Sequence, residues 1–490
     1  MKKVAIIGGG ITGLSAAYAV KRAQQEIDID YMVFEKSSRL GGKIYTERTE
    51  DGFAVEGGPD SFISTKPWIF ELARKLNCEN KIIGSNDELK KTYILVGNKL
   101  RELPDGVMMI VPTKIMPFLT TNLFSWPGKI RMAMDFFVPK KKDANDETLS
   151  SYVKRRLGKE CLDRLADPLV AGIYSSDPEQ MSLKATFPIL LEMEQKYGSL
   201  TRGMIVAMRN RRKAPTQGSA SGASGASGAS YEAERTLHMS FKGGMQDIVD
   251  EVYEALDKDK VFIDAEVLKV ERVNGSDGSI TYKLRMADGK IIEADAVIFA
   301  SPSNDTATLI EEIDRPLADV LNEIPQVSSA TVSLAYRKKD VKHDFKGFGF
   351  LVPLGEGRKI KACTWSSSKW SGRVPDNDHV IIRVFLGGAR TQQMAFLPDD
   401  KMEAVAKSEL KNIMGIDVEP IHIWIFRWSN GMPQYTIGHL DRLNKIDERV
   451  ANHPGIFLAG GSYRGVGIPD CINSGTKAVE GVLRYLDNTI

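Results

Sequence analysis

Cysteine is scarce in this chain, and the few cysteines are not grouped. The 490 residues contain four, at Cys78, Cys161, Cys363 and Cys471, and no two of them form a CxxC pair. This count and spacing exclude a disulfide-rich scaffold and a cysteine-based zinc site. No metal-ligand spacing occurs elsewhere in the sequence, so we predict no metal. We predict reduced thiols in a cytoplasmic protein.

An excess of charge of either sign is also lacking. Lys and Arg number 66 against 64 Asp and Glu, which leaves a formal net charge of +2. Proteins that bind nucleic acids usually carry a clear basic excess, so the composition gives no argument for such a partner. The hydrophobic fraction of 42% can fill the cores of two or three domains in a chain of this length.

Long hydrophobic runs are missing too. No window reaches the roughly 18 consecutive apolar residues that a transmembrane helix needs. The nearest approach, residues 107–126, contains Lys114, Pro112 and Pro117, and a basic run at 140–142 lies beyond it. We interpret this stretch as a pocket wall or packed helices with a solvated basic turn. The alternative is a weak, peripheral contact with an anionic membrane.

The most informative pattern that is present lies at the start of the chain. An apolar strand at Val4–Ile7 leads into Gly8, Gly10 and Gly13, and a helical run rich in leucine and alanine follows. The three glycines allow a sharp turn, a close approach of the backbone to a pyrophosphate, and tight packing of the helix on the sheet. Phosphates then lie at the positive end of the helix. The pattern predicts a dinucleotide-binding turn.

Three later features extend this prediction. The second apolar strand ends in Glu35, at about the offset where an acid binds the ribose hydroxyls. A second glycine turn, Arg39–Lys43, carries basic residues that can neutralise diphosphate charge. A third turn, Gly57–Phe62, combines two glycines with a proline and cannot be regular helix or central strand. Three such turns within about sixty residues indicate one extended ligand.

The periodicity of the apolar residues changes twice in the remaining chain. Helical periodicity dominates 66–231, although residues 214–230 consist largely of Ser, Gly and Ala and predict a flexible loop. Alternating apolar runs in 301–421 predict a mixed or antiparallel sheet on the substrate side. We therefore expect an α/β protein whose Rossmann-like, discontinuous nucleotide-binding domain spans 1–65, 232–300 and 422–490.

Several motifs along the chain resemble those of the FAD-dependent porphyrinogen oxidases, relatives of the amine oxidases and phytoene desaturases. They are Gly57–Phe62, Ala171–Pro178 with Thr186–Pro188, Trp428–His439 and Gly465–Cys471. The resemblance covers nearly the whole chain and is greatest to the bacterial branch that oxidises coproporphyrinogen III. Protoporphyrinogen IX is the alternative substrate.

The resemblance implies how FAD would be bound. The first turn would hold the pyrophosphate, Glu35 the adenosine ribose, Val267 the adenine through its backbone, and Trp428 the isoalloxazine region. The full set of implied cofactor-binding residues is Gly8, Gly9, Gly10, Ile11, Thr12, Gly13, Glu35, Lys36, Gly42, Lys43, Gly58, Pro59, Asp60, Ser61, Val267, Trp428, Val466, Gly467 and Ile468.

The resemblance also implies the reaction, a step of porphyrin and heme biosynthesis. Methylene bridges of the porphyrinogen lose hydride to the flavin in repeated two-electron rounds, O₂ is the acceptor, and H₂O₂ is released. No metal is required. A downstream ferrochelatase is expected to receive the product.

The carboxylates of such a substrate need basic groups at the rim of an apolar slot. Lys66 is the best candidate, and the candidate catalytic residue, because it follows the flavin-side turn closely; it would bind a propionate or assist proton departure near the flavin. A solvated lysine at a helix start is the alternative. His343 and His439 are interpreted as surface or packing residues, and Cys471 as a buried thiol rather than a covalent flavin link. Two rival functions share the fold: an amine oxidase with an aromatic cage, and a flavin-free chaperone of prenylated proteins.

Overall fold

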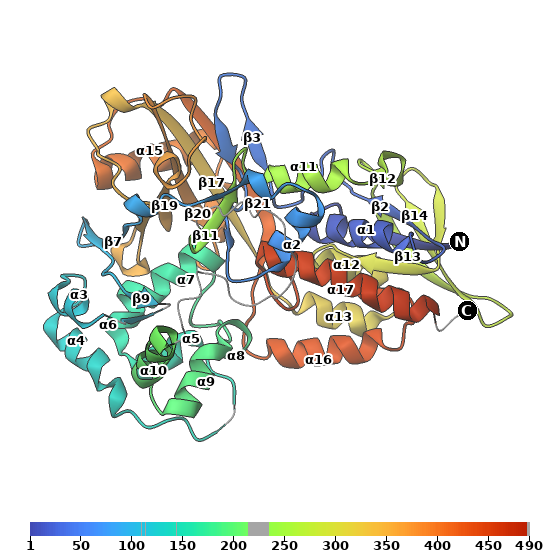
Figure 1. Ribbon diagram of the computed structural model, residues 1–490, viewed down its shortest axis with the longest axis horizontal. Coiled ribbons are helices and arrows are strands. Elements are labelled where there is room, and N and C mark those ends of the chain that lie inside the picture. The colour runs from blue at the N-terminus through green and yellow to red at the C-terminus, as the bar shows by residue number, and fades with distance from the viewer. Residues whose placement is uncertain (109, 113, 144, 214–234, 488–490) are drawn as a thin grey trace.

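A five-stranded parallel sheet forms the centre of the larger half of the molecule (Figure 1). Its order is β12 (Val261–Phe262), β2 (Ile29–Phe34), β1 (Lys2–Ile7), β16 (Ala296–Phe299) and β22 (Ile456–Leu458). The sheet therefore joins segments from both ends and the middle of the chain, as the predicted discontinuous domain requires. The computed structural model describes residues 1–108, 110–112, 114–143, 145–213 and 235–487.

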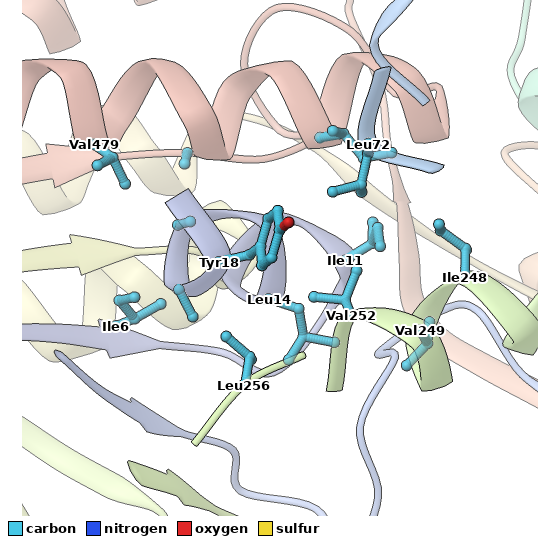
Figure 2. Packing of buried hydrophobic residues seen from close by; sticks show 14 of the residues in the cluster. Ile6, Ile11, Leu14, Tyr18, Leu72, Ile248, Val249, Val252, Leu256 and Val479 are labelled. Atoms are coloured by element: carbon cyan, nitrogen blue, oxygen red, sulfur yellow. The ribbon is translucent and has the colours of Figure 1, made fainter. Parts of the chain in front are cut away.

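Strand β1 is buried on both faces, and its side chains alternate between two cores. Val4 and Ile6 belong to the core under helices α1 (Ile11–Ala23) and α17 (Ile468–Asp487). Figure 2 shows Leu14 and Tyr18 of α1 packed among residues from other segments, including Ile6 of β1, Leu72, Val252 and Val479 of α17. The helices approach closely because Gly475 of α17 has no side chain; a Cβ there would lie 2.3 Å from the Thr12 carbonyl oxygen.

Ala5 and Ile7 face the opposite core, where three helices and a three-stranded antiparallel sheet cover the parallel sheet. The packed side chains include Leu317, Leu321 and Leu443, which lie on two of these helices. This three-layer arrangement confirms the predicted α/β fold class. The elements on this face are α12 (Ser303–Ile310), α13 (Arg315–Asn322), α16 (His439–Val450), β13 (Val267–Asn274), β14 (Ile280–Met286) and β15 (Ile291–Ala294).

The second large element is a seven-stranded, mostly antiparallel sheet that α15 (Asp399–Met414) covers on one face. Its order is β21 (His422–Pro433), β17 (Gln326–Arg337), β20 (His379–Gly387), β19 (Ala362–Trp365), β18 (Gly349–Leu351), β7 (Thr92–Val96) and β8 (Lys99–Glu102).

The strands of this sheet cross two of the expected domain boundaries. β7 and β8 lie within the segment expected to be helical, and β21 lies within the segment assigned to the nucleotide-binding domain. Alternating apolar residues identify a strand, but they do not say which sheet the strand joins. The helix α2 (Trp68–Lys75) also lies within the segment expected to form the helical region. Its residues Ile69 and Leu72 pack instead in the core under α1 and α17.

Residues from about 115 to 213 form a cluster of short helices, consistent with the predicted helical region (Figure 1). Local signals set several starts: Ser125 caps α4 and Thr148 caps α5 with side-chain oxygens that accept backbone N–H groups. The predicted loop 214–230 lies outside the described residues. The helices are α3 (Ile115–Thr120), α4 (Trp126–Ala133), α5 (Leu149–Arg156), α7 (Asp167–Tyr174), α8 (Leu183–Thr186), α9 (Pro188–Tyr197) and α10 (Leu200–Lys213).

A charged network is buried in the middle of this helical region. Arg156 is fully buried, and its guanidinium donates a 2.6 Å hydrogen bond to Asp135. The other oxygen of Asp135 accepts from the Ser199 hydroxyl at 2.6 Å and the Thr201 N–H at 2.8 Å. Glu194, also fully buried, lies 3.5 Å from the same guanidinium. The network joins three helices through charges that water does not reach.

The apolar stretch near residue 120 was interpreted as a pocket wall or packed helices, and the structure corrects this in part. Trp126 is 64% exposed and Phe137 is 83% exposed, with Met116, Ile130 and Met134 also on the surface. These residues alternate with buried ones such as Leu123 and Met132, so each short helix packs only one face. Within the described residues, no helix combines the length and the apolar character needed to cross a bilayer.

Candidate functional site

The first glycine turn connects β1 to α1 with little room for side chains. Gly8 has a φ of +112°, which favours glycine, and a Cβ at Gly13 would lie 1.9 Å from the Gly8 carbonyl oxygen. Gly10 is different: its backbone is extended, and an added Cβ would contact only Gly42, at 3.9 Å. The space beside Gly10 is therefore open.

Helix α1 begins at that open space. Ile11 and Thr12 are its first residues and both are buried, and no side chain caps the helix at Gly10. An uncapped helix start next to a glycine with open space beside it fits a phosphate group, because the backbone N–H groups and the helix dipole favour an anion there.

Glu35 lies beside this turn, as predicted from its position after β2. Its carboxylate accepts hydrogen bonds from the Gly9 N–H at 2.7 Å and the Ser37 N–H at 2.9 Å. Val267 is buried in the same core as Phe34 of β2, and two residues before it the Ala265 N–H donates to the Glu35 carbonyl oxygen at 2.9 Å. Lys36, in contrast, is exposed and pairs with Asp305 at 3.0 Å.

The second glycine turn lies directly against the first. The Gly41 N–H donates to the Gly9 carbonyl oxygen at 2.9 Å. The Arg39 guanidinium donates to the Gly42 carbonyl oxygen at 2.7 Å, so it holds the turn instead of remaining free for a diphosphate. The Lys43 side chain is reached by solvent, yet enough protein surrounds it that desolvation lowers its pKa. Lys43 thus combines an exposed side chain with dense protein surroundings.

The third turn is fixed by residues of the seven-stranded sheet. Arg383 donates to the carbonyl oxygens of Gly57 at 2.9 Å and Gly58 at 2.6 Å, and the Trp428 indole N–H donates to Gly57 at 2.8 Å. A Cβ at Gly58 would lie 1.8 Å from the Lys43 carbonyl oxygen. The second and third turns therefore touch, and Trp428 reaches them from β21.

Asp60 anchors the end of the third turn, between the partly buried Pro59 and Ser61. Its carboxylate binds the Lys369 ammonium at 2.9 Å and the Trp370 indole N–H at 3.2 Å. Burial alone would raise the pKa of Asp60, but Lys369 and Arg383 hold it well below its usual range. Nothing near Asp60 in the sequence indicates these partners, because they are separated from it by about three hundred positions.

The C-terminal glycine turn reaches the same region. The Tyr435 hydroxyl donates to the Gly461 carbonyl oxygen at 2.7 Å and accepts from the Gly465 N–H at 2.8 Å. His439 stacks on Tyr435, with ring centroids 4.0 Å apart, and bonds the Tyr463 carbonyl oxygen at 2.8 Å. Burial lowers the pKa of His439 to about 4. His439 is a neutral packing residue, as interpreted from the sequence.

The start of α17 lies against the first glycine turn, because α17 packs on Thr12 at the start of α1. Val466 and Gly467 are partly exposed, and Ile468 is buried at the first position of the helix. Cys471 lies one turn further, where burial raises the pKa of its thiol. All four cysteines are free, which agrees with the prediction of reduced thiols. Lys43 is near enough to Cys471 for their charges to interact.

Lys66, the candidate catalytic residue, also reaches the start of α17. Its ammonium lies 2.5 Å from the Asp470 carboxylate, and its side chain is 41% exposed. The structure thus gives Lys66 an acidic partner that the sequence did not suggest. Whether it acts in catalysis stays a prediction. Within the described residues, no group of acids, histidines or cysteines could hold a metal ion.

The four glycine turns form one continuous lining from β2 to α17. An uncapped helix start, the acid at the end of β2 and the open side of Gly10 suit the phosphates and ribose of a dinucleotide. The other end, at Gly57 and Gly58, is flanked by Arg383 and Trp428 of the seven-stranded sheet. Such a lining fits an elongated cofactor whose far end faces a second domain.

Comparisons with known proteins agree with this geometry. The profile of the family described as flavin containing amine oxidoreductase matches residues 11–483. Coproporphyrinogen III oxidase of Bacillus subtilis is 35% identical over 488 residues, covering 99% of this chain and 98% of that protein. Protoporphyrinogen oxidase 2 of Arabidopsis thaliana is 28% identical, covering 99% and 95%.

A solved structure has the same fold. The crystal structure of a protein from Exiguobacterium sp. 255-15, described by similarity to protoporphyrinogen oxidase, superimposes with a TM-score of 0.83 and 31% identity over 99% of both chains. The match extends through the parallel sheet, the helical region and the seven-stranded sheet. This chain belongs to the flavin containing amine oxidoreductase family.

Proposed function

We propose that this protein uses FAD to oxidise coproporphyrinogen III to coproporphyrin III, with O₂ as acceptor and H₂O₂ as second product. The observation that carries the proposal is the full-length match to bacterial coproporphyrinogen III oxidases at up to 35% identity, against 28% for the plant protoporphyrinogen oxidase. The continuous cofactor lining supports the same chemistry.

The protein's contribution is binding and orientation. When FAD is bound, its ring system accepts hydride from the substrate. Gly8 to Gly13 and Glu35 would hold the nucleotide part, and Gly58 with Trp428 would hold the ring end. The turns are immobilised by Arg39 and Arg383, so the cleft needs little rearrangement to orient both molecules.

An aerobic assay tests the proposal directly. We expect the purified protein to show a flavin spectrum and to convert coproporphyrinogen III to a fluorescent porphyrin faster than protoporphyrinogen IX. Faster turnover of protoporphyrinogen IX would identify the alternative substrate. If the flavin-loaded protein oxidised neither porphyrinogen, the proposal would be contradicted, and amines would be the next substrates to test. A protein without flavin would point to a chaperone.

Glu35 provides a first prediction. Removing a charged hydrogen-bond acceptor costs about 1.5–3 kcal/mol, so Glu35→Ala should weaken FAD binding by about tenfold to a hundredfold. Equilibrium dialysis with absorbance detection measures this. Because Glu35 also holds the Gly9 N–H, Glu35→Gln serves as the control. Unchanged FAD retention in the alanine variant would disprove the assignment.

Lys66 provides a second prediction. If Lys66 acts near the flavin ring, Lys66→Ala should lower kcat for both porphyrinogens by roughly tenfold to a hundredfold and leave KM nearly unchanged, because each charged contact is worth about 1.5–3 kcal/mol. Steady-state kinetics on both substrates measures the effect.

The Asp470 carboxylate, left without Lys66, needs a control of its own. Lys66→Ala combined with Asp470→Asn removes the unpaired charge, so recovery in the double variant would assign the loss to Asp470. A rise in KM for coproporphyrinogen alone would instead indicate a propionate contact. No effect on kcat or KM would show that Lys66 is only a solvated residue before the start of α2.

Three further points belong to the same proposal. Four free thiols favour a reducing compartment, and we propose the cytoplasm. The exposed apolar side chains near Trp126 and Phe137, with Lys140 beside them, are compatible with peripheral membrane contact. The porphyrin product has to be passed on for metal insertion, and a ferrochelatase is the proposed recipient.

A further inference from the structure

A small cavity lies where the helical region meets the seven-stranded sheet. Its volume is about 50 Å³, and it lies between the end of α7, the turn before β19 and the turn after β20. A cavity needs roughly 10–15 Å³ of this kind of volume to hold one water molecule, so this one has room for a group the size of a carboxylate. Residues that line it include Ser175, Lys361, Gly388 and Arg390.

Lys361 differs from the two arginines that line this cavity in its partners, and from Lys359, which is exposed, in its burial. Arg390 lies 2.6 Å from both Asp167 and Asp177, and Arg358 lies 3.6 Å from Glu409, so both have acidic partners. Lys361 donates a 2.6 Å hydrogen bond to the Ser175 hydroxyl and forms no ion pair within the described part of the chain.

The backbone around Lys361 is arranged in an unusual way. Ser175 has a φ of +53° although it is not glycine, and its carbonyl oxygen accepts the Ala389 N–H at 2.8 Å. Gly388 has a φ of +93°, and a Cβ there would lie 3.2 Å from the Lys361 nitrogen. The two turns are thus held together with the ammonium between them, and such strain concentrates at functional sites.

The groups around Lys361 are mostly basic, and the nearby aspartates pair with another residue. Burial, followed by the nearby Arg383 charge, lowers the pKa of Lys361 to about 7. The charged groups around the cavity come from every neighbouring element: Arg383, Arg390, Asp167, Asp177, Arg358 and Lys359. The two aspartates are already engaged by Arg390. A partly buried ammonium without an acid is stabilised when an external carboxylate supplies the missing charge.

The cavity is linked to the proposed active site through strand β20. The Lys361 N–H donates to the Phe385 carbonyl oxygen of β20 at 3.0 Å. Arg383, two residues earlier on the same strand, holds Gly57 and Gly58 of the third glycine turn. Lys361 is therefore one strand away from the residue that fixes that turn.

We propose that Lys361 and the Ser175 hydroxyl form a subsite that binds a propionate carboxylate of the porphyrinogen. This inference rests on the proposed function, since it names the part of that substrate which the subsite recognises. Lys66 already has a carboxylate partner, whereas Lys361 has none, so Lys361 is the better anchor for a substrate acid.

The test measures binding of coproporphyrin III, the stable product, to the flavin-loaded protein by fluorescence quenching. Lys361→Gln should weaken binding about tenfold to a hundredfold, and Lys361→Arg should restore part of it. The tetramethyl ester of coproporphyrin, which has no carboxylates, should bind both proteins equally. Lys339→Gln, the same change at an exposed lysine beyond β17, should have no effect.

The pH dependence adds an independent readout. As pH rises through about 7, Lys361 loses its proton while the propionates stay ionised, so wild-type binding should weaken. The Lys361→Gln profile should be flat across the same interval. Lys361→Met, checked by flavin content and melting temperature, replaces the glutamine variant if the latter does not fold.

The possible failures are distinguishable. Wild-type protein that oxidises no porphyrinogen would overturn the proposed function. Wild-type protein that oxidises coproporphyrinogen while Lys361→Gln leaves both the porphyrin Kd and the KM unchanged would overturn the subsite alone. Equal weakening for the acid and its ester would also overturn it, because the loss would then come from shape and not from charge.

Discussion

Gly10→Ala is expected to yield a folded protein that has lost most of its FAD. The backbone at Gly10 is extended, with φ −72° and ψ 173°, and an added Cβ contacts only Gly42 at 3.9 Å. The apo protein therefore tolerates the methyl group. The methyl group enters the space that we assign to the pyrophosphate, where overpacking costs about 1–3 kcal/mol, or about fivefold to more than a hundredfold in Kd.

FAD titration by flavin fluorescence, paired with the melting temperature of the FAD-free protein, measures both effects. Gly355→Ala is the matched control, because Gly355 has an ordinary φ and no atom within 4 Å of an added Cβ. Gly13→Ala is the contrasting variant, since its methyl group would meet the Gly8 carbonyl oxygen and disturb the turn itself. Full FAD affinity in Gly10→Ala would show that the phosphates lie elsewhere.

Asp135→Ala should cause the largest loss of stability among these variants. The change removes the carboxylate that accepts from Arg156, Ser199 and Thr201, and it leaves a fully buried guanidinium without its closest acid. Breaking a buried pair from one side costs about 3–5 kcal/mol. Chemical denaturation followed by circular dichroism should show an early transition for the helical region.

Glu179→Ala is the matched comparison for this variant. Glu179 pairs with Lys154 at 2.7 Å, but both side chains are about half exposed. Pairs of that kind contribute about 0–1 kcal/mol, so the transition should hardly move. A similar small shift for Asp135→Ala would mean that Glu194 alone compensates Arg156.

The nucleotide-binding half was predictable because its signals are local. A strand, three spaced glycines and a helix follow one another directly, and Glu35 ends the next strand. The structure places all of these at one edge of the parallel sheet. The contacts that fix the other turns were not predictable. Arg383 and Lys369 come from elements whose position depends on sheet pairing, and nothing near Gly57 or Asp60 indicates them.

The acidic partner of Lys66 illustrates the same limit. Lys66 stands before α2 and Asp470 stands at the start of α17, four hundred positions later, so their ion pair depends on α2 packing against α17. The Lys361 subsite was missed for a second reason. A lysine beside a strand normally points to solvent, and only the bend at Ser175 and Gly388 encloses it.

The order of strands in the parallel sheet has a consequence during translation. β1 is synthesised first and β2 soon after, but the second partner of β1, β16, follows only at residues 296–299, and β22, which pairs with β16, at 456–458. At about 5–20 residues per second, a ribosome needs roughly 20–90 s to reach the last strand. Until β16 is made, β1 has one unpaired edge, and until α17 is made, α1 has an uncovered apolar face, which nascent-chain chaperones would have to shield. Cellular flavin can stabilise only the completed chain, because the start of α17 is the last part of its site to be made.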